Sequence, residues 1–289
     1  MRGDGDGWVC CERGHRHWGR FGAAGVLVRD RREGDRVVLQ HRAGWSHEGG
    51  TWGFPGGARD SGESPVTAAL REAAEEANFD TASVRPIGLV CDDHGGWSYV
   101  TVLAEPVGHL DPRPVGGEST AVEWMPVDRV GDLLLHPGFA STWPRLRAAP
   151  GGLRLVIDAA NVVGAVGRGD GWWRDRPAAT RRLLTALMSL HSAGIPAGRL
   201  PPGPWRTTLD HAFPQVILVV EGTARTVADD PPGPVEVRAA TGSGDYAVVA
   251  AAREAPATTV VVTADRQLRQ RVSAAGSAWA GPSWLTATL

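Results

Sequence analysis

Residues 57–79 read GARDSGESPVTAALREAAEEANF, a glycine-containing loop that runs into the clearest helix pattern of the chain. Ser64 and Pro65 are typical of a helix start, because serine caps the first turn well and proline fits the first helical position. The pattern predicts a helix over residues 65–77. At about 100° per residue, its small and aliphatic side chains fall on one face and three glutamates fall on the other: Glu72, Glu75 and Glu76.

Three carboxylates on one helix face repel one another, and each close pair costs a few tenths of a kcal/mol. A divalent cation would offset this repulsion. Carboxylate oxygens suit Mg²⁺, which can bridge phosphate oxygens, polarise a phosphorus centre and activate a water molecule. A solvated helix face is the alternative interpretation of the three glutamates taken alone.

The residues around the glutamates favour the metal site. Glu63 in the preceding loop and Arg71 in the helix stand at defined sequence spacings from the three glutamates. The segment resembles the signature of the Nudix hydrolase family, G-x5-E-x7-R-E-U-x-E-E-x-G-U, in which U is a bulky aliphatic residue. Gly57, Glu63, Arg71 and the three glutamates match at the required spacing. Asn78 replaces the last glycine, and asparagine is the next best residue for a left-handed helix end. Ala73 is smaller than the usual aliphatic residue, which affects local packing rather than chemistry.

The resemblance covers about residues 20–145. It implies an α/β/α sandwich with a mixed sheet that hydrolyses a nucleoside diphosphate linked to another group. It also implies that the three helix glutamates bind Mg²⁺ or Mn²⁺, that Arg71 orients a glutamate, and that Glu63 supports the site or binds a further ion. The general base stays open between Glu118 and Glu123, each of which is also an ordinary surface carboxylate.

Glycine and aromatic residues near this segment are candidate substrate contacts. Gly56 and Gly57 allow the backbone to approach a ligand closely. Aromatic side chains that could stack on a base, or could equally serve the core, are Trp45, Trp52, Phe54 and Trp97. The sequence does not identify the base.

A group of cysteines and histidines near the start has the chemistry of a zinc site: Cys10, Cys11, His15 and His17. Adjacent cysteines and the lack of a second cysteine pair make the spacing poor for zinc. Zinc binding therefore stays an open question at this point.

The 289-residue length favours two domains over one. Proline and glycine punctuate residues 144–152, just before an apolar strand begins at Leu153. We therefore expect a first domain at residues 1–148, with residues 1–19 as an N-terminal extension, and a second domain at residues 152–289.

The bulk composition excludes several classes of protein. The basic residues are all arginine, as in GC-rich bacterial genomes, so a P-loop lysine and Schiff-base chemistry are excluded. The net charge is −2, which argues against a broad nucleic-acid-binding face. No apolar run approaches the roughly 20 residues of a membrane helix, and the start lacks an export signal, so we expect a cytoplasmic protein.

In the second half, three apolar strands each run into an acidic residue: Asp158, Glu221 and Asp265. Strands alternate there with helices, which predicts a parallel sheet covered on both faces. The carboxyl ends of such strands line the crevice where ligands bind, and Asp245 at a helix start could join them. The alternative is that Asp245 and Asp265 cap helices and that Glu221 begins a turn.

This half is similar to PIN-like nucleases of the NYN type, through Asp158-Ala-Ala-Asn161 and Thr263-Ala-Asp265. The resemblance implies a Rossmann-like domain in which Mg²⁺ or Mn²⁺, held by Asp158, Asp245 and Asp265, activates water against an RNA phosphodiester. Asn161 would orient the substrate. Arg174, with Trp172, Trp173 and Arg176, could contact single-stranded RNA or form a structural lid.

The leading hypothesis is a fusion of two phosphate-cleaving enzymes, a nucleotide pyrophosphohydrolase and a metal-dependent ribonuclease. A narrower version has the first domain trim a nucleotide or an RNA 5′ end. The rival hypothesis is a nucleotide sensor, in which the first domain binds a ligand and the second is a non-catalytic nucleic-acid-binding module. The sequence does not indicate the oligomeric state.

Overall fold

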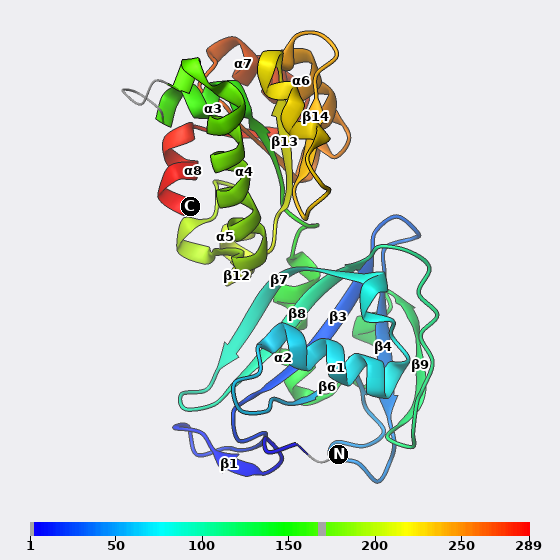
Figure 1. The fold of residues 1–289 in the computed structure, drawn as a ribbon. Coiled ribbons are helices and arrows are strands. Elements are labelled where there is room, and N and C mark those ends of the chain that lie inside the picture. Colours follow the sequence, from blue (N-terminus) through cyan, green and yellow to red (C-terminus); the bar gives the residue numbers. More distant parts are fainter. Residues whose placement is uncertain (1–2, 167–171) are drawn as a thin grey trace. The chain divides into compact units, whose positions relative to one another are not determined.

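A computed structural model describes residues 3–166 and 172–289 and shows two compact units (Figure 1). The first comprises Met1–Ala149 with Thr208–Asp210, and the second comprises Pro150–Thr207 and His211–Leu289. The boundary expected at residues 148–152 lies next to the change of unit after Ala149. The segment 208–210 was not predicted to belong with the first unit. It packs there through Asp210, whose carboxylate accepts hydrogen bonds from the Cys91 backbone (2.7 Å) and from Arg145 (2.9 Å).

The first unit is built on a mixed sheet with the strand order β7-β8-β3-β4-β5. Strand β6 pairs with β3, and β9 pairs with β4. The β3–β8 pair is parallel, whereas the other pairs among these strands are antiparallel. The strands are β3 (Ala23–Asp30), β4 (Arg36–Arg42), β5 (Trp52–Gly53), β6 (Gly56–Ala58), β7 (Val84–Asp93), β8 (Ser98–Pro106) and β9 (Ser119–Pro126). A short N-terminal hairpin consists of β1 (Trp8–Cys10) and β2 (Arg16–Trp18).

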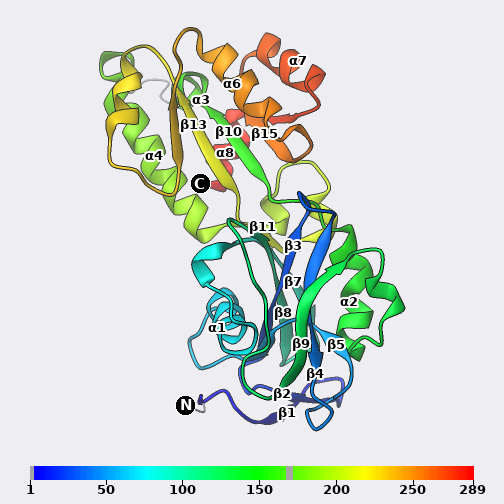
Figure 2. The same cartoon turned by 90° about the vertical axis from the view of Figure 1, so that its right-hand side faces the viewer.

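Helices α1 (Pro65–Ala77) and α2 (Pro137–Ala148) lie on opposite sides of this sheet (Figure 2). The expected α/β/α sandwich with a mixed sheet is therefore confirmed. Four alanines of α1 are buried against valines of β3, β4 and β8, so the small side chain at Ala73 fits a close helix-to-sheet contact. Helix α2 was not predicted, because Pro144 was taken as part of the domain boundary, yet it lies inside the helix.

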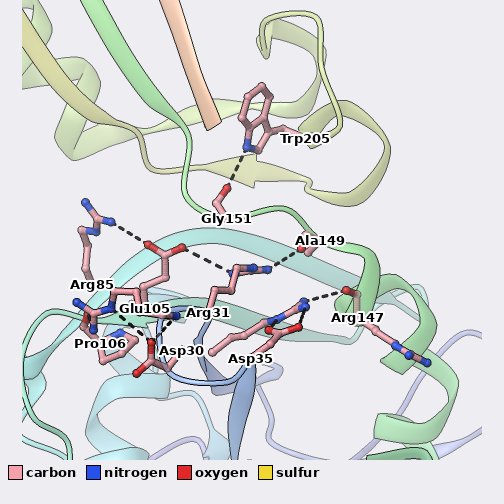
Figure 3. Close-up of polar contacts among 12 residues, drawn as sticks. Asp30, Arg31, Asp35, Arg85, Glu105, Pro106, Arg147, Ala149, Gly151 and Trp205 are labelled. Carbon is pink, nitrogen blue, oxygen red and sulfur yellow. Dashed lines mark hydrogen bonds and ion pairs between the residues drawn. The ribbon is translucent and has the colours of Figure 1, made fainter. Parts of the chain in front are cut away.

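Two partly buried arginines of the sheet region, Arg29 and Arg31, bond the end of α2 (Figure 3). Arg29 donates to Asp35 and to the Arg147 carbonyl, while Arg31 donates to the Ala149 carbonyl at 2.7 Å. Glu105 lies 3.7 Å from Arg31 and balances its charge. Burial, together with the charge of Arg29, lowers the pKa of Arg31 to about 10.

The second unit contains a fully parallel sheet with the order β14-β13-β10-β15-β16. The predicted parallel sheet is therefore confirmed. Its strands are β10 (Arg154–Asp158), β13 (Gln215–Val220), β14 (Glu236–Ala239), β15 (Thr259–Val262) and β16 (Ala278–Ala280). Strand β11 (Ile195–Pro196) pairs antiparallel with β12 (His211–Ala212). The helices are α3 (Ala159–Val166), α4 (Arg176–Ala193), α5 (Trp205–Thr208), α6 (Gly244–Arg253), α7 (Arg266–Ala274) and α8 (Pro282–Thr288).

Helices cover both faces of this sheet, with α3, α4 and α8 on one side and α6 and α7 on the other (Figure 1). The three central strands, β10, β13 and β15, are mainly apolar, as expected for strands buried on both faces. The Trp205 indole donates to the Gly151 carbonyl at 3.1 Å and fixes the start of the unit (Figure 3). After β10 the chain adds β13 and β14 on one side of it, and then adds β15 and β16 on the other side. The strand order therefore reverses between β10 and β15, and ligand sites form at such a reversal in parallel sheets. None of the helices in the described ranges is long and apolar enough to cross a membrane.

Glu254 at the end of α6 generates a prediction about acid stability. Hydrogen bonds from Arg238 and then Arg154 lower the pKa of Glu254 to about 2. A lowered carboxyl pKa stabilises the fold above the unfolded value of about 4.3, and this contribution is lost as the pH falls toward 2. We expect Glu254→Gln to lower the free energy of unfolding at pH 7 by about 1 kcal/mol, since the carboxylate is half exposed. The variant should also lose less stability than the parent between about pH 4.5 and 2.

Denaturant unfolding at a series of pH values measures this effect. Asp229→Asn, at an exposed acidic position in the same unit, is the matched control and should follow the parent curve. Identical pH profiles for the parent protein and Glu254→Gln would contradict the assignment.

Candidate functional site

Helix α1 begins and ends where its sequence predicts. The Ser64 hydroxyl accepts a hydrogen bond from the Thr67 backbone at 3.1 Å, and Pro65 occupies the first turn. Asn78 closes the helix in the left-handed conformation at φ 57°. The two caps therefore set where the helix that carries the three glutamates begins and ends.

Arg71 is the hub of this acidic face. Its guanidinium donates to both carboxylate oxygens of Glu63 at 3.1 and 3.0 Å, and to Glu72 at 2.7 Å. It also donates to the Ala58 carbonyl of β6 at 3.0 Å. The hydrogen bonds from Arg71 lower the pKa of Glu63, so that carboxylate stays ionised. One side chain thus joins the loop, the strand and the helix.

The three helix glutamates occupy different environments. Burial and then the charge of Glu72 raise the pKa of Glu76 to about 7, and its carboxylate accepts from the Gly56 backbone at 3.1 Å. Burial also raises the pKa of Glu72, with Arg71 opposing the shift. Glu75 is 62% exposed and lies 3.8 Å from Arg71. The cluster therefore combines two carboxylates that are partly shielded from water, Glu72 and Glu76, with one that is exposed, Glu75.

The two glycines of β6 permit close packing around these glutamates. A Cβ atom on Gly56 would lie 2.5 Å from the Gly25 backbone, and one on Gly57 would lie 2.6 Å from the Glu72 carboxylate. The structure thus gives these positions a reason that is independent of substrate. Their proposed contact with a ligand remains a prediction.

Two polar residues beside these glutamates, Gln40 and Tyr99, were missed by the sequence reasoning. The Gln40 side chain hydrogen-bonds Glu76 and also accepts from Ser119 at 3.2 Å. Tyr99 is partly buried near the same carboxylate, and burial together with the charge of Glu76 raises the tyrosine pKa. A glutamine inside the apolar strand Arg36–Arg42 was the available sequence signal.

The two candidates for the general base differ in position. The charge of Glu118 contributes to the raised pKa values of Glu72 and Glu76, so Glu118 lies close to the acidic face. Glu123 is exposed on β9 between Val122 and Trp124, which pack into the core beneath α1. Because side chains alternate along a strand, Glu123 points away from that core.

The four candidate aromatic residues also differ in how far they are buried. Phe54 is buried edge-to-face against Tyr99 and Phe139, and Trp97 is buried with one ring face stacked on His17. Both rings therefore have packing partners in the core, and their proposed role as substrate contacts stays a prediction. Trp45 is 72% exposed, and Trp52 is half-buried.

The donors of this face fit Mg²⁺ in type, because they are carboxylate oxygens. Among residues 3–166 and 172–289, three or more His, Cys, Asp or Glu donors gather closely enough to share one ion only at the N-terminal hairpin, and not at either acidic cluster. Mg²⁺ usually takes one or two protein carboxylates and keeps several waters. An open set of carboxylates with mutually unfavourable charges therefore suits this ion.

Asp158 forms the centre of a second cluster, at the carboxyl end of β10. Its carboxylate accepts from the Asn161 amide at 2.6 Å and from the Thr263 hydroxyl at 2.9 Å. Burial raises the pKa of Asp158, and the charge of Asp245 adds to this shift. The cluster lies beside β15, where the strand order reverses.

The other predicted members of that cluster have structural partners. Asp265 caps α7 by accepting from the Leu268 backbone at 2.8 Å, and Asp245 pairs with Arg271 at 3.2 Å. Glu221 accepts from the Gly244 backbone at 2.7 Å. Asp265 is therefore a helix cap, as the alternative interpretation predicted. Its metal-binding role stays a prediction.

The residues proposed to contact RNA lie after α3. Arg174 and Trp173 are exposed in the short 3-10 helix Trp172–Arg174. The Trp172 side chain and residues 167–171 lie outside the described part of the chain.

Comparison with known proteins identifies the first unit. The NUDIX domain family matches residues 19–146. A Mycobacterium tuberculosis protein named "Putative 8-oxo-dGTP diphosphatase 3" is 48% identical over 164 residues, which cover 54% of this chain and 75% of that protein. The chain belongs to the Nudix hydrolase family.

Two further relatives share this Nudix region. A Bifidobacterium longum protein named "Nucleoside triphosphate pyrophosphatase/Nudix hydrolase fusion protein" is 47% identical over 150 residues, covering 50% of this chain and 31% of that protein. The crystal structure of the Mycobacterium smegmatis Nudix hydrolase RenU is 46% identical, covers 50% of this chain and 93% of that one, and gives a TM-score of 0.47. The family match ends at residue 146, so the nuclease resemblance of the second unit rests on its own residues.

Proposed function

We propose that the Nudix unit is a Mg²⁺-dependent hydrolase that cleaves a diphosphate linkage in a nucleotide. The observation that carries this proposal is the Arg71 hub, which fixes Glu63 and Glu72 around a face that also holds Glu75 and Glu76. Membership of the Nudix family supports the reaction class.

In this proposal Glu72, Glu75 and Glu76 hold Mg²⁺, which would supply charge neutralisation and polarisation of the phosphate group. Arg71 keeps the Glu72 carboxylate in one orientation, since its guanidinium is itself fixed by Glu63 and by the Ala58 carbonyl. The Gly56 N–H positions Glu76. Glu118 then takes a proton from the attacking water.

For the substrate, we propose a purine nucleoside triphosphate with an oxidised base, such as 8-oxo-dGTP. The names of the Mycobacterium tuberculosis relative and of a Proteus vulgaris relative, 38% identical over 71 residues, support this choice. Trp45 and Trp52 offer exposed or half-exposed ring surface for stacking on the base.

Glu75→Gln tests the hydrolase proposal without removing a buried contact. Since even outer partners of a metal site are worth about 10–100-fold, we expect turnover of the best substrate to fall by more than about 100-fold. The assay separates and quantifies the nucleoside monophosphate formed from a panel of nucleoside triphosphates, including 8-oxo-dGTP, and nucleoside diphosphate derivatives, with Mg²⁺.

Glu33→Gln, at an exposed glutamate outside the site, is the matched control and should retain full turnover. Tight binding of a nucleotide by the parent protein without any turnover would instead favour the nucleotide sensor. Equal turnover by the parent protein and Glu75→Gln would sink the proposed metal site.

Glu118 and Glu123 provide a matched pair for the general base. We expect Glu118→Gln to lower kcat by about 10²–10⁴-fold, the range that a general base contributes, with little change in KM. Glu123→Gln should leave both constants within about twofold of the parent, because its side chain points away from the site. Equal effects of the two substitutions would remove Glu118 from the mechanism.

We further propose that the second unit is a PIN-like, metal-dependent ribonuclease. The Asp158 cluster favours this function, because a buried carboxylate held by Asn161 and Thr263 lies where the strand order reverses. Asp158 and Asp245 are the carboxylates proposed to hold Mg²⁺ or Mn²⁺, with Asp265 as a further candidate. Arg174 would contact the RNA backbone.

Cleavage of labelled single-stranded RNA by the full chain, with Mn²⁺ or Mg²⁺, tests this activity. We expect Asp158→Asn to lower cleavage by more than about 100-fold, while Asp229→Asn and Glu75→Gln should leave it unchanged. If purified parent protein cleaves no RNA, or if Asp158→Asn cleaves it equally well, the second unit is not the nuclease proposed.

A further inference from the structure

Four side chains near the N-terminus bring metal-binding atoms together outside both acidic clusters. Cys11, His15, His17 and His94 each offer one ligand atom, and these atoms lie within 4.8 Å of one another. The first three belong to the β1–β2 hairpin region, and His94 belongs to the turn between β7 and β8. The sequence had grouped Cys10 with the hairpin residues, but Cys10 is exposed and does not belong to this cluster.

The chemistry and spacing of the cluster suit zinc. Thiolate sulfur and imidazole nitrogen are the ligands that structural Zn²⁺ takes in a tetrahedral arrangement. Bonds of about 2.0–2.3 Å place such ligands roughly 3.5 Å apart, so small side-chain rotations would complete the site. Hard oxygen ligands, which Mg²⁺ prefers, are absent from this group of four.

Two ring nitrogens of the cluster are buried without a hydrogen-bond partner: His17 Nε2 and His94 Nδ1. A buried polar atom that lacks a partner is costly, and such atoms call for a water, an ion or another explanation. His94 Nε2 lies 3.1 Å from the Asp92 carboxylate. When that carboxylate accepts the proton of Nε2, the Nδ1 lone pair is free to bind a metal ion.

Packing and backbone hydrogen bonds position His17 and Cys11. The His17 ring stacks on Trp97 at 3.9 Å, and the Trp97 indole donates to the Gly19 carbonyl at 3.0 Å. Cys11 is 5% exposed, and its backbone donates to the His15 carbonyl at 3.0 Å. Glu12 is bonded through its backbone to Gly95 at 2.9 Å, which joins the hairpin to the β7–β8 turn.

We propose that Cys11, His15, His17 and His94 bind one structural Zn²⁺ ion. Four protein ligands leave no open position for substrate, which is the pattern of structural rather than catalytic zinc. The ion would fasten the N-terminal hairpin to the β7–β8 turn and would be distinct from the Mg²⁺ of the glutamate face.

The segment just before the hairpin in turn contacts the loop that precedes α1. The Gly5 backbone donates to Asp60 at 2.9 Å, and the Ser61 backbone donates to Asp4 at 2.9 Å. The Asp60 backbone donates to Glu63 at 3.1 Å. Zinc at the far end of the hairpin would thus stabilise the segment that holds Glu63 against Arg71.

Metal analysis of untagged, full-length protein by mass spectrometry tests the proposal. We expect about one zinc per chain in the parent protein, and at least a fivefold loss in Cys11→Ala and in His94→Ala. Cys10→Ala is the matched control, one residue away and equally a cysteine, and should keep its zinc. Glu75→Gln should also keep its zinc while losing hydrolysis, so the zinc site and the hydrolase proposal can fail separately.

Replacement of the metal by Co²⁺ in the parent protein gives a readout that does not depend on how variants fold. We expect the visible spectrum of tetrahedral Co²⁺ with a thiolate charge-transfer band, and Cys11→Ser should lose that band. Parent protein that binds less than about one tenth of an equivalent of zinc after reconstitution would overturn the proposal. Equal zinc loss in Cys10→Ala and Cys11→Ala would also overturn it.

Discussion

The contact between Arg71 and its carboxylates is the interaction on which the Nudix site depends. A helix face with three glutamates is unfavourable by itself, and the guanidinium offsets part of that repulsion while it anchors the helix to Glu63 and to the Ala58 carbonyl. The glycines of β6 let the strand come close enough for this contact. Charge, backbone and helix position are therefore set together, and the remaining repulsion is what a divalent cation can relieve.

Features encoded by neighbouring residues could be predicted from the sequence. The bounds of α1 and the left-handed conformation of Asn78 follow from capping preferences and helical periodicity, which are local. The parallel strands of the second unit follow from short apolar runs between helices. Helix α2 was missed because Pro144 is tolerated inside it, and a proline in the sequence does not show whether its helix continues.

Features that depend on distant residues could not be predicted. Phe54 and Trp97 were aromatic candidates for stacking, but only the fold shows that other rings cover them. His94 lies close to Cys11, His15 and His17 in the fold but far from them in the sequence. That separation matches no zinc-binding motif, so the sequence could not indicate His94 as a member of the cluster. An aspartate at position 265 suits both a helix cap and a metal ligand, so the sequence could not distinguish these two roles.

The placement of Thr208–Asp210 affects how this protein can be dissected. The Asp210 carboxylate accepts from the Cys91 backbone and from Arg145, so part of the Nudix fold is supplied by residues that follow β10 and α4 in the chain. A fragment that stops at residue 149 would leave these two donors without their acceptor. The halves are therefore interleaved in covalent order, and gene truncation at the apparent boundary is a poorer way to separate their activities than inactivating one site in the intact polypeptide.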